Sequence, residues 1–219
     1  MLNYLFSNPL LFFVYLIALL VAIAIHEFSH AYAADYLGDP TPRLAGRLKL
    51  NPLVHIDGLG LIFLLFFGFG WGKPVGFDPY NLKNPRKDAA VISLAGPFSN
   101  FILALLLSII LKLIIFFKLS LLQNTAYFLL APIISLNIIL GVFNLIPIHP
   151  LDGFKIVGGL LSEEKAREWY QLERYGIIFL LMLIFPFGRS SLLDLIIRPV
   201  VSFMLTLLIP AGIGGGINY

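Results

Sequence analysis

The sequence predicts an all-α, multi-pass membrane protein with about five to six transmembrane helices. Of its 219 residues, 59% are hydrophobic and 12% are charged, whereas soluble domains carry about 25% charged residues. A chain of this size cannot bury so much apolar surface in its own core, so the surplus must face lipid. Several apolar stretches also reach about 20 residues, the length that a helix needs to cross a bilayer.

Four apolar stretches are the expected membrane-spanning regions, and the first three are residues 9–37, 89–117 and 125–148. The fourth, residues 176–210, is broken near Pro186 and is long enough for two closely connected spans, the first of them short. The first stretch lacks a small-residue cleavage site, so we interpret it as a retained span. A cleaved signal peptide is the alternative.

The connection between the first two spans differs from them in character. Residues 41–52 are rich in turn formers, and residues 47–50 alternate as a strand does. Residues 59–67 are apolar but too short to cross, and glycines flank them. This pattern predicts a small membrane-associated β-hairpin region, which is tolerable only where protein or a cavity covers its backbone. Farther along, the polar residues 162–175 predict a surface helix.

The distribution of charge predicts the orientation in the membrane. Seven Lys and Arg residues lie between the first two spans, and four lie between the third span and the fourth apolar stretch. The positive-inside rule makes that face cytoplasmic and leaves the N-terminus outside. We expect the lipid bilayer as the surroundings and no nucleic-acid partner, because the chain has no basic run. With no internal repeat and no soluble second domain, residues 1–219 are expected to form a single integral-membrane domain.

The absence of cysteine narrows the chemistry. It excludes thiolate zinc ligands, iron–sulfur clusters and cysteine nucleophiles. Any metal must therefore be held by His, Asp or Glu, and the chain has four His. Four histidines cannot fill the histidine-rich ligand set of a di-iron membrane oxidase.

The HExxH motif His26–Glu27–Phe28–Ser29–His30 lies inside the first expected span. On a helix, residues four apart share one face about 6 Å apart along the axis, so both imidazoles can reach one metal. Glu27 is rotated away from the centre of the pair and can touch a metal-bound water without being a ligand. Ionisable groups in a membrane helix are costly and are normally kept for function, which favours a zinc site over a chance motif.

A catalytic zinc usually has three protein ligands and a water, so a third ligand is required. Asp152 is the best candidate, because it follows the third span and therefore returns to the face where His26 and His30 lie. The alternative is that the Asp-Gly pair only marks a turn. His149 is a competing ligand, and its other interpretations are a partner of a ligand or an interfacial residue.

Three motifs resemble those of the site-2 protease family of intramembrane zinc metalloproteases. They are the HExxH motif, residues 95–100 (AGPFSN) and residues 144–153 (NLIPIHPLDG). Residues 47–52 (RLKLNP) and 55–57 (HID) are similar to a compact prokaryotic branch of the family without a PDZ domain. The likeness covers roughly residues 10–205, and three motifs in this order are far more specific than HExxH alone.

The resemblance implies a metalloprotease domain with one Zn²⁺ per chain, bound by His26, His30 and Asp152, with Glu27 as the general base. Its catalytic core would cover about residues 10–160, and its C-terminal spans about 176–210. It implies cleavage of transmembrane segments of membrane proteins, which is regulated intramembrane proteolysis. The charge distribution places the active site near the cytoplasmic side of the cell membrane. His149 is a departure, since related sequences often carry proline there.

Two residues are candidates for substrate binding. Asn144 is a candidate second stabiliser of the oxyanion, although an interhelical hydrogen bond or a helix cap explains it equally well. His55, in the hairpin region, would orient substrate or have a structural role. We interpret Asn100 and Asn137 as helix-packing groups.

Two other functions remain as alternatives at this point. A transporter or channel with a structural metal site would also retain buried ionisable groups, although such proteins usually have matched internal repeats. A membrane zinc hydrolase of a non-peptide substrate is the second alternative.

Overall fold

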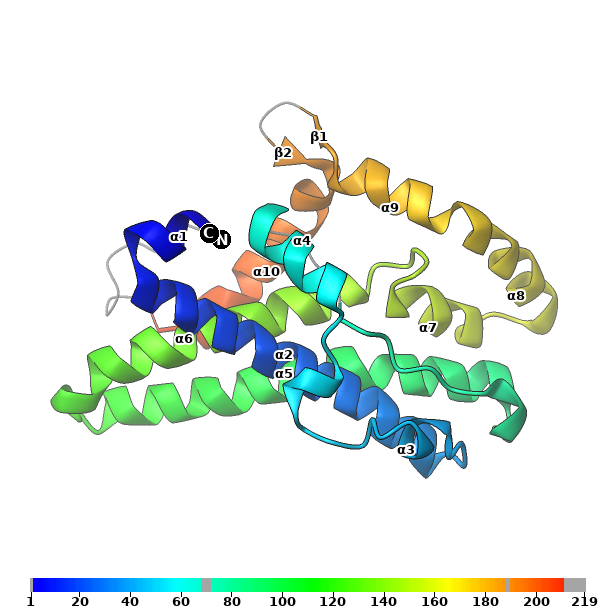
Figure 1. Ribbon diagram of the computed structural model, residues 1–219, viewed down its shortest axis with the longest axis horizontal. Coiled ribbons are helices and arrows are strands. Elements are labelled where there is room, and N and C mark those ends of the chain that lie inside the picture. Colours follow the sequence, from blue (N-terminus) through cyan, green and yellow to red (C-terminus); the bar gives the residue numbers. More distant parts are fainter. Residues whose placement is uncertain (1, 68–71, 188–189, 211–219) are drawn as a thin grey trace.

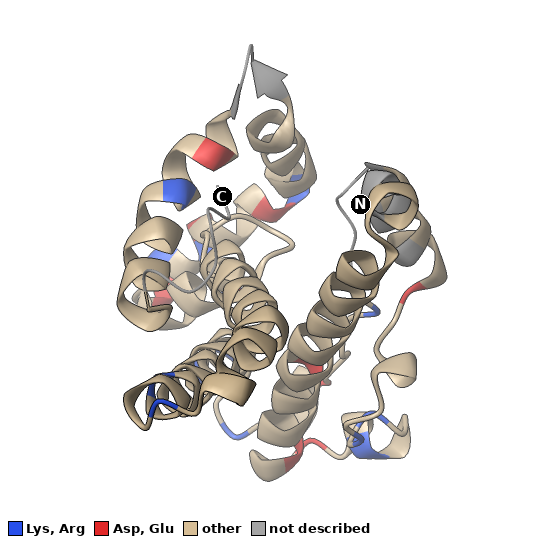
Figure 2. Ribbon diagram, turned by 90° about the vertical axis from the view of Figure 1, so that its left-hand side faces the viewer, with Lys and Arg blue, Asp and Glu red and all other residues tan. Residues whose placement is uncertain are grey.

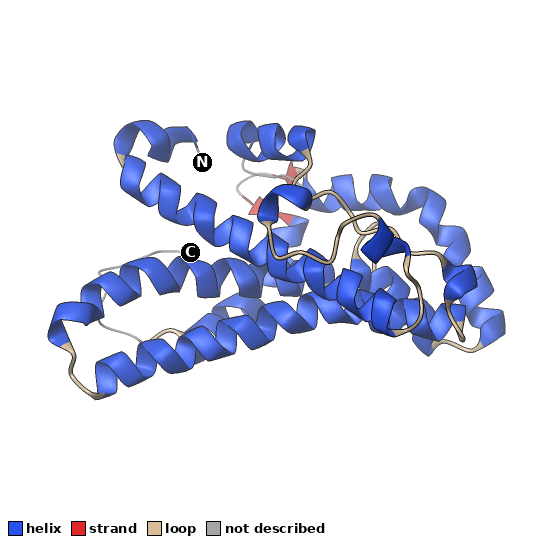
Figure 3. Cartoon of the chain, turned by 60° about the horizontal axis from the view of Figure 1, so that its bottom comes forward, coloured by secondary structure: helices blue, strands red, loops and turns tan. Residues whose placement is uncertain are grey.

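The computed structural model describes residues 2–67, 72–187 and 190–210, and these residues are almost entirely helical (Figures 1 and 3). The strands among them are β1 (Pro186–Phe187) and β2 (Ser190–Ser191), which pair antiparallel. The prediction of an all-α architecture is therefore confirmed.

Three helices are long and apolar enough to cross a membrane: α2 (Pro9–Tyr36), α5 (Pro85–Phe116) and α6 (Ser120–Asn144). Their bounds lie within five residues of the predicted spans, because a long apolar run leaves few alternatives to a helix in lipid. Long stretches of helix carry no charged residue (Figure 2). The chain is a membrane protein.

The predicted total of five to six spans is not confirmed. The fourth apolar region is divided into α9 (Gly176–Ile184) and α10 (Leu192–Leu208), with 9 and 17 residues. At 1.5 Å per residue, α9 is about 14 Å long, which is short against a hydrocarbon core of about 30 Å.

The predicted β-hairpin between the first two spans is not confirmed either. In this connection the described residues form the helices α3 (Thr41–Leu44) and α4 (Gly58–Phe67), the 3-10 turns η1 (Pro52–Val54) and η2 (Pro79–Asn81), and one isolated β-bridge between Ile56 and Gly72. An uninterrupted apolar run has no alternation with a period of two, and a helix satisfies its own backbone groups in an apolar setting.

The remaining helices lie at the ends of the three long ones. They are α1 (Leu2–Ser7), α7 (Asp152–Leu160), α8 (Glu163–Tyr170) and the 3-10 turn η3 (Gln171–Tyr175). The predicted surface helix corresponds to α8 and η3. In Figure 1, α5 and α6 run side by side, α2 crosses them, and α7 lies against the N-terminal part of α5.

Small side chains allow the long helices to approach one another closely. Ala18 and Ala22 on α2, Ala104 on α5 and Ala131 on α6 are fully buried. In a bilayer, where apolar surface gains little by leaving lipid, such close van der Waals packing is a main source of helix association. An apolar cluster of α5, α6 and α10 then completes the core, with Ile134, Ile138 and Leu205 among its members.

Asp39 ties the end of α2 to the chain that precedes α5. Its fully buried carboxylate accepts hydrogen bonds from the Thr41 hydroxyl (2.6 Å), the Asn81 amide (2.8 Å) and the Asp78 backbone N–H (2.7 Å). Burial alone would raise the pKa of Asp39, but these hydrogen bonds outweigh it and hold the pKa below its ordinary value.

The Asp39 network predicts a pH-dependent part of the stability. Because the folded-state pKa is lowered, this contribution is present above about pH 3.9, the unfolded value, and is lost as the pH falls through the folded value. We expect Asp39→Asn to cost about 1–3 kcal/mol near neutral pH, measured by denaturant unfolding of the detergent-solubilised protein. The difference from the unchanged protein should shrink below pH 4, and a constant difference would contradict this prediction.

Candidate metal centre

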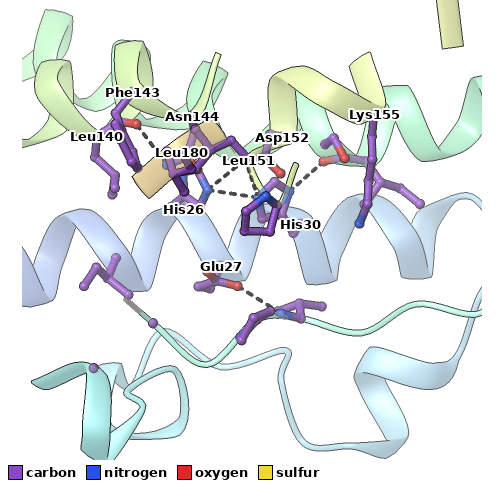
Figure 4. A pocket seen from close by; sticks show the side chains of 18 of the residues that line it. His26, Glu27, His30, Leu140, Phe143, Asn144, Leu151, Asp152, Lys155 and Leu180 are labelled. Carbon is purple, nitrogen blue, oxygen red and sulfur yellow. Dashed lines mark hydrogen bonds and ion pairs between the residues drawn. The ribbon is translucent and has the colours of Figure 1, made fainter. Parts of the chain in front are cut away.

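Three side chains from two helices converge on one point in the interior. His26 and His30 lie one turn apart on α2, and Asp152 is the first residue of α7. Their Nε2 atoms are 3.0 Å apart, and Asp152 Oδ2 is 3.1 Å from His26 Nε2 and 3.2 Å from His30 Nε2 (Figure 4). The histidines are 5% and 8% exposed. Over a hundred residues of sequence separate the two helices, yet their ligand atoms meet.

The hydrogen-bond partners of the two Nδ1 atoms fix the protonation state of both imidazoles. His26 Nδ1 lies 2.7 Å from Asn100 Oδ1, and His30 Nδ1 lies 2.7 Å from the carbonyl oxygen of Ile92. Both oxygens only accept, so each Nδ1 must carry the proton and each neutral Nε2 presents its lone pair. The Asn100 amide orientation is itself fixed, because Nδ2 donates to Ala22 O and Asn137 Oδ1.

This arrangement fits a metal cation. The buried Asp152 Oδ2 has no hydrogen-bond partner among the described residues. It faces the lone pairs of the two Nε2 atoms, and no hydrogen-bond donor lies between these three atoms. Such a group is repulsive unless a cation lies at its centre. Separations of 3.0–3.2 Å are close to the roughly 3.3 Å expected between ligands placed 2.0–2.1 Å from a tetrahedral zinc.

Gly96 on α5 makes room for the two imidazoles. A Cβ at this position would overlap His30 Nε2 and would lie 2.8 Å from His26 Cε1. Asn100 follows one turn later and reaches His26, so the predicted motif of residues 95–100 provides both the space and the hydrogen bond for the ligands. Sequence reasoning had assigned Asn100 to helix packing, and its contact with His26 Nδ1 was missed.

Gly153 has the corresponding role for the third ligand. A Cβ there would overlap the carbonyl oxygen of Leu145, at the end of α6. The chain can therefore turn back beneath α6 and begin α7 at Asp152 only with glycine in this place. The Asp-Gly pair is thus both a turn and the source of a ligand atom.

Glu27 lies beside the ligand group and is held by a different part of the chain. Its Oε2 accepts the backbone N–H of Val75 at 3.1 Å, as Figure 4 shows. Val75 belongs to residues 72–77, which we call the covering segment. This irregular segment is anchored by a hydrogen bond from the Lys73 N–H to the carbonyl oxygen of His55 (2.7 Å).

A cavity of about 530 Å³ opens beside the three ligand residues and Glu27. Apolar side chains of α2, α6 and α9 form most of its wall, and the covering segment closes one side. The sequence had not identified the covering segment as part of the site. Its glycines, which flank an apolar helix, were the available signal.

The other predicted site residues have different positions. Asn144 lines the cavity, and its amide donates to Leu140 O one turn earlier on α6. His55 is fully buried, contacts the carbonyl oxygen of Lys49 through Nε2 (2.7 Å) and is not among the described residues that line the cavity. His149 lies 3.6 Å from Glu173 and outside the ligand group.

The fold and this centre together define a membrane-embedded metallohydrolase. More particularly, residues 14–119 and 110–185 match Peptidase family M50. The chain belongs to this family, the site-2 protease family, and is a zinc metalloprotease. The alternatives of a transporter, a channel or a hydrolase of non-peptide bonds are thereby set aside.

Curated relatives agree with this assignment. The chain is 38% identical, over 80% of its own length and 82% of the relative, to YwhC of Bacillus subtilis, whose name describes it as a candidate zinc metalloprotease. It is 30% identical to Rip2 of Mycobacterium tuberculosis, which is named in the same way, over 75% of this chain and 63% of that protein. Zinc metalloprotease MJ0392 of Methanocaldococcus jannaschii is 29% identical over 72% of this chain and 37% of its own length. No solved structure matches the chain.

We expect Gly96→Ala to weaken zinc binding by about tenfold or more, because its Cβ would displace the imidazoles from Asp152. The measurement is the zinc content of the purified protein during titration with a chelator. Gly58→Ala is the matched control, since a Cβ there meets nothing within 4 Å. Equal zinc affinity of the two variants would contradict the proposed role of Gly96.

Proposed function

We propose that this protein is an intramembrane zinc metalloendopeptidase that cleaves peptide bonds in or near the transmembrane segments of other membrane proteins. The observation that carries the proposal is the convergence of two imidazoles and a carboxylate beside an apolar cavity on a helix long enough to span a bilayer. A soluble peptide would gain nothing from a site at this depth. A substrate that already lies in the membrane can reach it laterally.

The chemistry follows from the ligand set of His26, His30 and Asp152. Zinc, when bound, supplies a Lewis acid that lowers the pKa of water toward about 7 and polarises a carbonyl. Glu27 is the general base, which accepts the proton of the attacking water and returns it to the departing amine. The Val75 N–H supports this role because it fixes the direction of the Glu27 carboxylate.

The location and the orientation are part of the proposal. Seven Lys and Arg residues lie between the end of α2 and the first turn of α5, and four lie between α6 and α9, and the positive-inside rule makes this face cytoplasmic. The active site then lies in the cell membrane near its cytoplasmic side. Residues 1–219 act as one catalytic domain.

The substrate must lose its own helix before it can be cleaved, since a helix keeps its carbonyl groups in internal hydrogen bonds. The unwound chain would lie along the covering segment, which lines the cavity through Gly72, Pro74 and Val75. Residues 47–51, whose alternation resembles that of a strand, are less suitable because the Lys49 N–H and carbonyl are already hydrogen-bonded. Asn144 remains the candidate for holding the developing oxyanion.

Glu27→Gln is expected to retain zinc and to lower the cleavage rate by at least about a hundredfold, because the amide cannot accept the proton. The assay is cleavage of single-span substrates by the purified protein, with zinc content measured in parallel. Glu163→Gln on the exposed face of α8 is the matched control. A normal rate for Glu27→Gln would exclude Glu27 as the base.

Substrates with weakened transmembrane helices should be cleaved faster. A Gly or Pro placed near the scissile bond lowers the cost of unwinding by about 1–3 kcal/mol relative to Ala, which allows a rate increase of roughly fivefold or more. A series of otherwise identical substrates with Ala, Gly or Pro tests this. The same rate for all three would contradict the requirement for unwinding.

A further inference from the structure

Lys155 is the one Lys or Arg among the described residues that line the catalytic cavity. It lies on α7, three residues after Asp152, and Figure 4 shows it at the end of the cavity beyond His30, away from Leu140 and Asn144. Its Nζ is 4.9 Å from the centre of the Phe77 ring in the covering segment. The lysine therefore extends from α7 toward the covering segment at one end of the space where a substrate would lie.

The other charged groups of the cavity already have partners. Glu27 accepts the Val75 N–H, and Asp152 faces the two imidazoles. By contrast, none of the ion pairs between described residues includes Lys155. Lys155 is half-buried at the edge of a mostly apolar cavity, where a cation without a counter-ion is costly.

The Phe77 ring holds the ammonium group of Lys155 in place. An aromatic face stabilises an ammonium group, but less than a partly buried, hydrogen-bonded carboxylate does. The contact thus holds Nζ beside the covering segment without satisfying its charge fully. A ligand with a negative charge is the complement that this end of the cavity lacks.

We propose that Lys155 is a specificity-determining residue that binds an Asp or Glu side chain of the substrate. This inference rests on the proposed function and specifies its substrate class: membrane proteins with an acidic residue on the side of the scissile bond that faces the C-terminal end of α2. Three residues on α7 span about 4.5 Å, and an extended peptide advances about 3.3 Å per residue. The acidic residue therefore falls within about four residues of the scissile bond.

The test is a charge exchange between enzyme and substrate. Single-span substrates carry Ala, Glu or Lys at each of the four positions before and the four positions after the scissile bond, so that the side facing Lys155 is included. The value of kcat/KM is measured in detergent with the unchanged protein, Lys155→Gln and Lys155→Glu. The unchanged protein should prefer Glu over Ala by about tenfold at one of these positions. The preference should vanish in Lys155→Gln and change to Lys in Lys155→Glu. Lys165→Gln, on exposed α8, is the control and should keep the preference for Glu.

A binding measurement separates this inference from the proposed function. The affinities of the same substrates for Glu27→Gln and for Glu27→Gln combined with Lys155→Glu are compared without turnover. If the charge preference appears in these binding measurements although the unchanged protein cleaves no substrate, the inference stands and the proposed function fails. If substrates are cleaved but Lys155→Glu does not reverse the preference, the inference is overturned and the proposed function stands.

Anionic lipid is the competing ligand for a lysine at this depth. The rate comparison is therefore repeated in vesicles with zwitterionic lipid alone and with added anionic lipid. A substrate-charge preference that is equal in both vesicles supports the proposal. An effect of Lys155→Gln that follows the lipid charge and ignores the substrate charge overturns it.

Discussion

The structure depends on the contact between α2 and α5 at Gly96. Two imidazoles need to meet a carboxylate inside the membrane, where an unbalanced ionisable group costs roughly 2.5–3.5 kcal/mol or more. The two helices can come close enough only because residue 96 has no side chain. The same close contact of α2 and α5 brings Asn100 Oδ1 to His26 and the carbonyl oxygen of Ile92 to His30, and these two hydrogen bonds orient the imidazoles.

This constraint also explains why the interior of the bundle contains so many amides. Asn100 connects His26 with Ala22 and Asn137, so α2, α5 and α6 share one hydrogen-bonded junction. Polar networks of this kind are favourable only when each member is satisfied. The ligand geometry is therefore coupled to the packing of all three long helices, and a change in any of them reaches the metal centre.

The sequence predicted the parts of the site that have a local signature. The HExxH spacing places two imidazoles on one face of any helix, and the alternation of three spans predicted that Asp152 returns to the same face, so the grouping of these three residues could be anticipated. Asn100, Val75 and Gly96 could not be assigned their contacts, because those contacts join segments 48 to 74 residues apart and depend on how helices rotate against one another. Likewise, residues 58–67 have an apolar run compatible with either a buried strand or a helix, and only tertiary context decides between them.

The covering segment contacts both Glu27, the proposed base, and Lys155. Its backbone holds Glu27 through Val75, its Phe77 ring holds Lys155, and its residues wall the cavity between these two points. A substrate chain that displaces or tightens this segment must therefore change the setting of both side chains at once. The segment is anchored at one end because the Lys73 N–H donates to the carbonyl oxygen of His55, and His55 is itself fully buried. The proposed base and the proposed specificity residue are therefore held by one short segment, which couples their positions to each other.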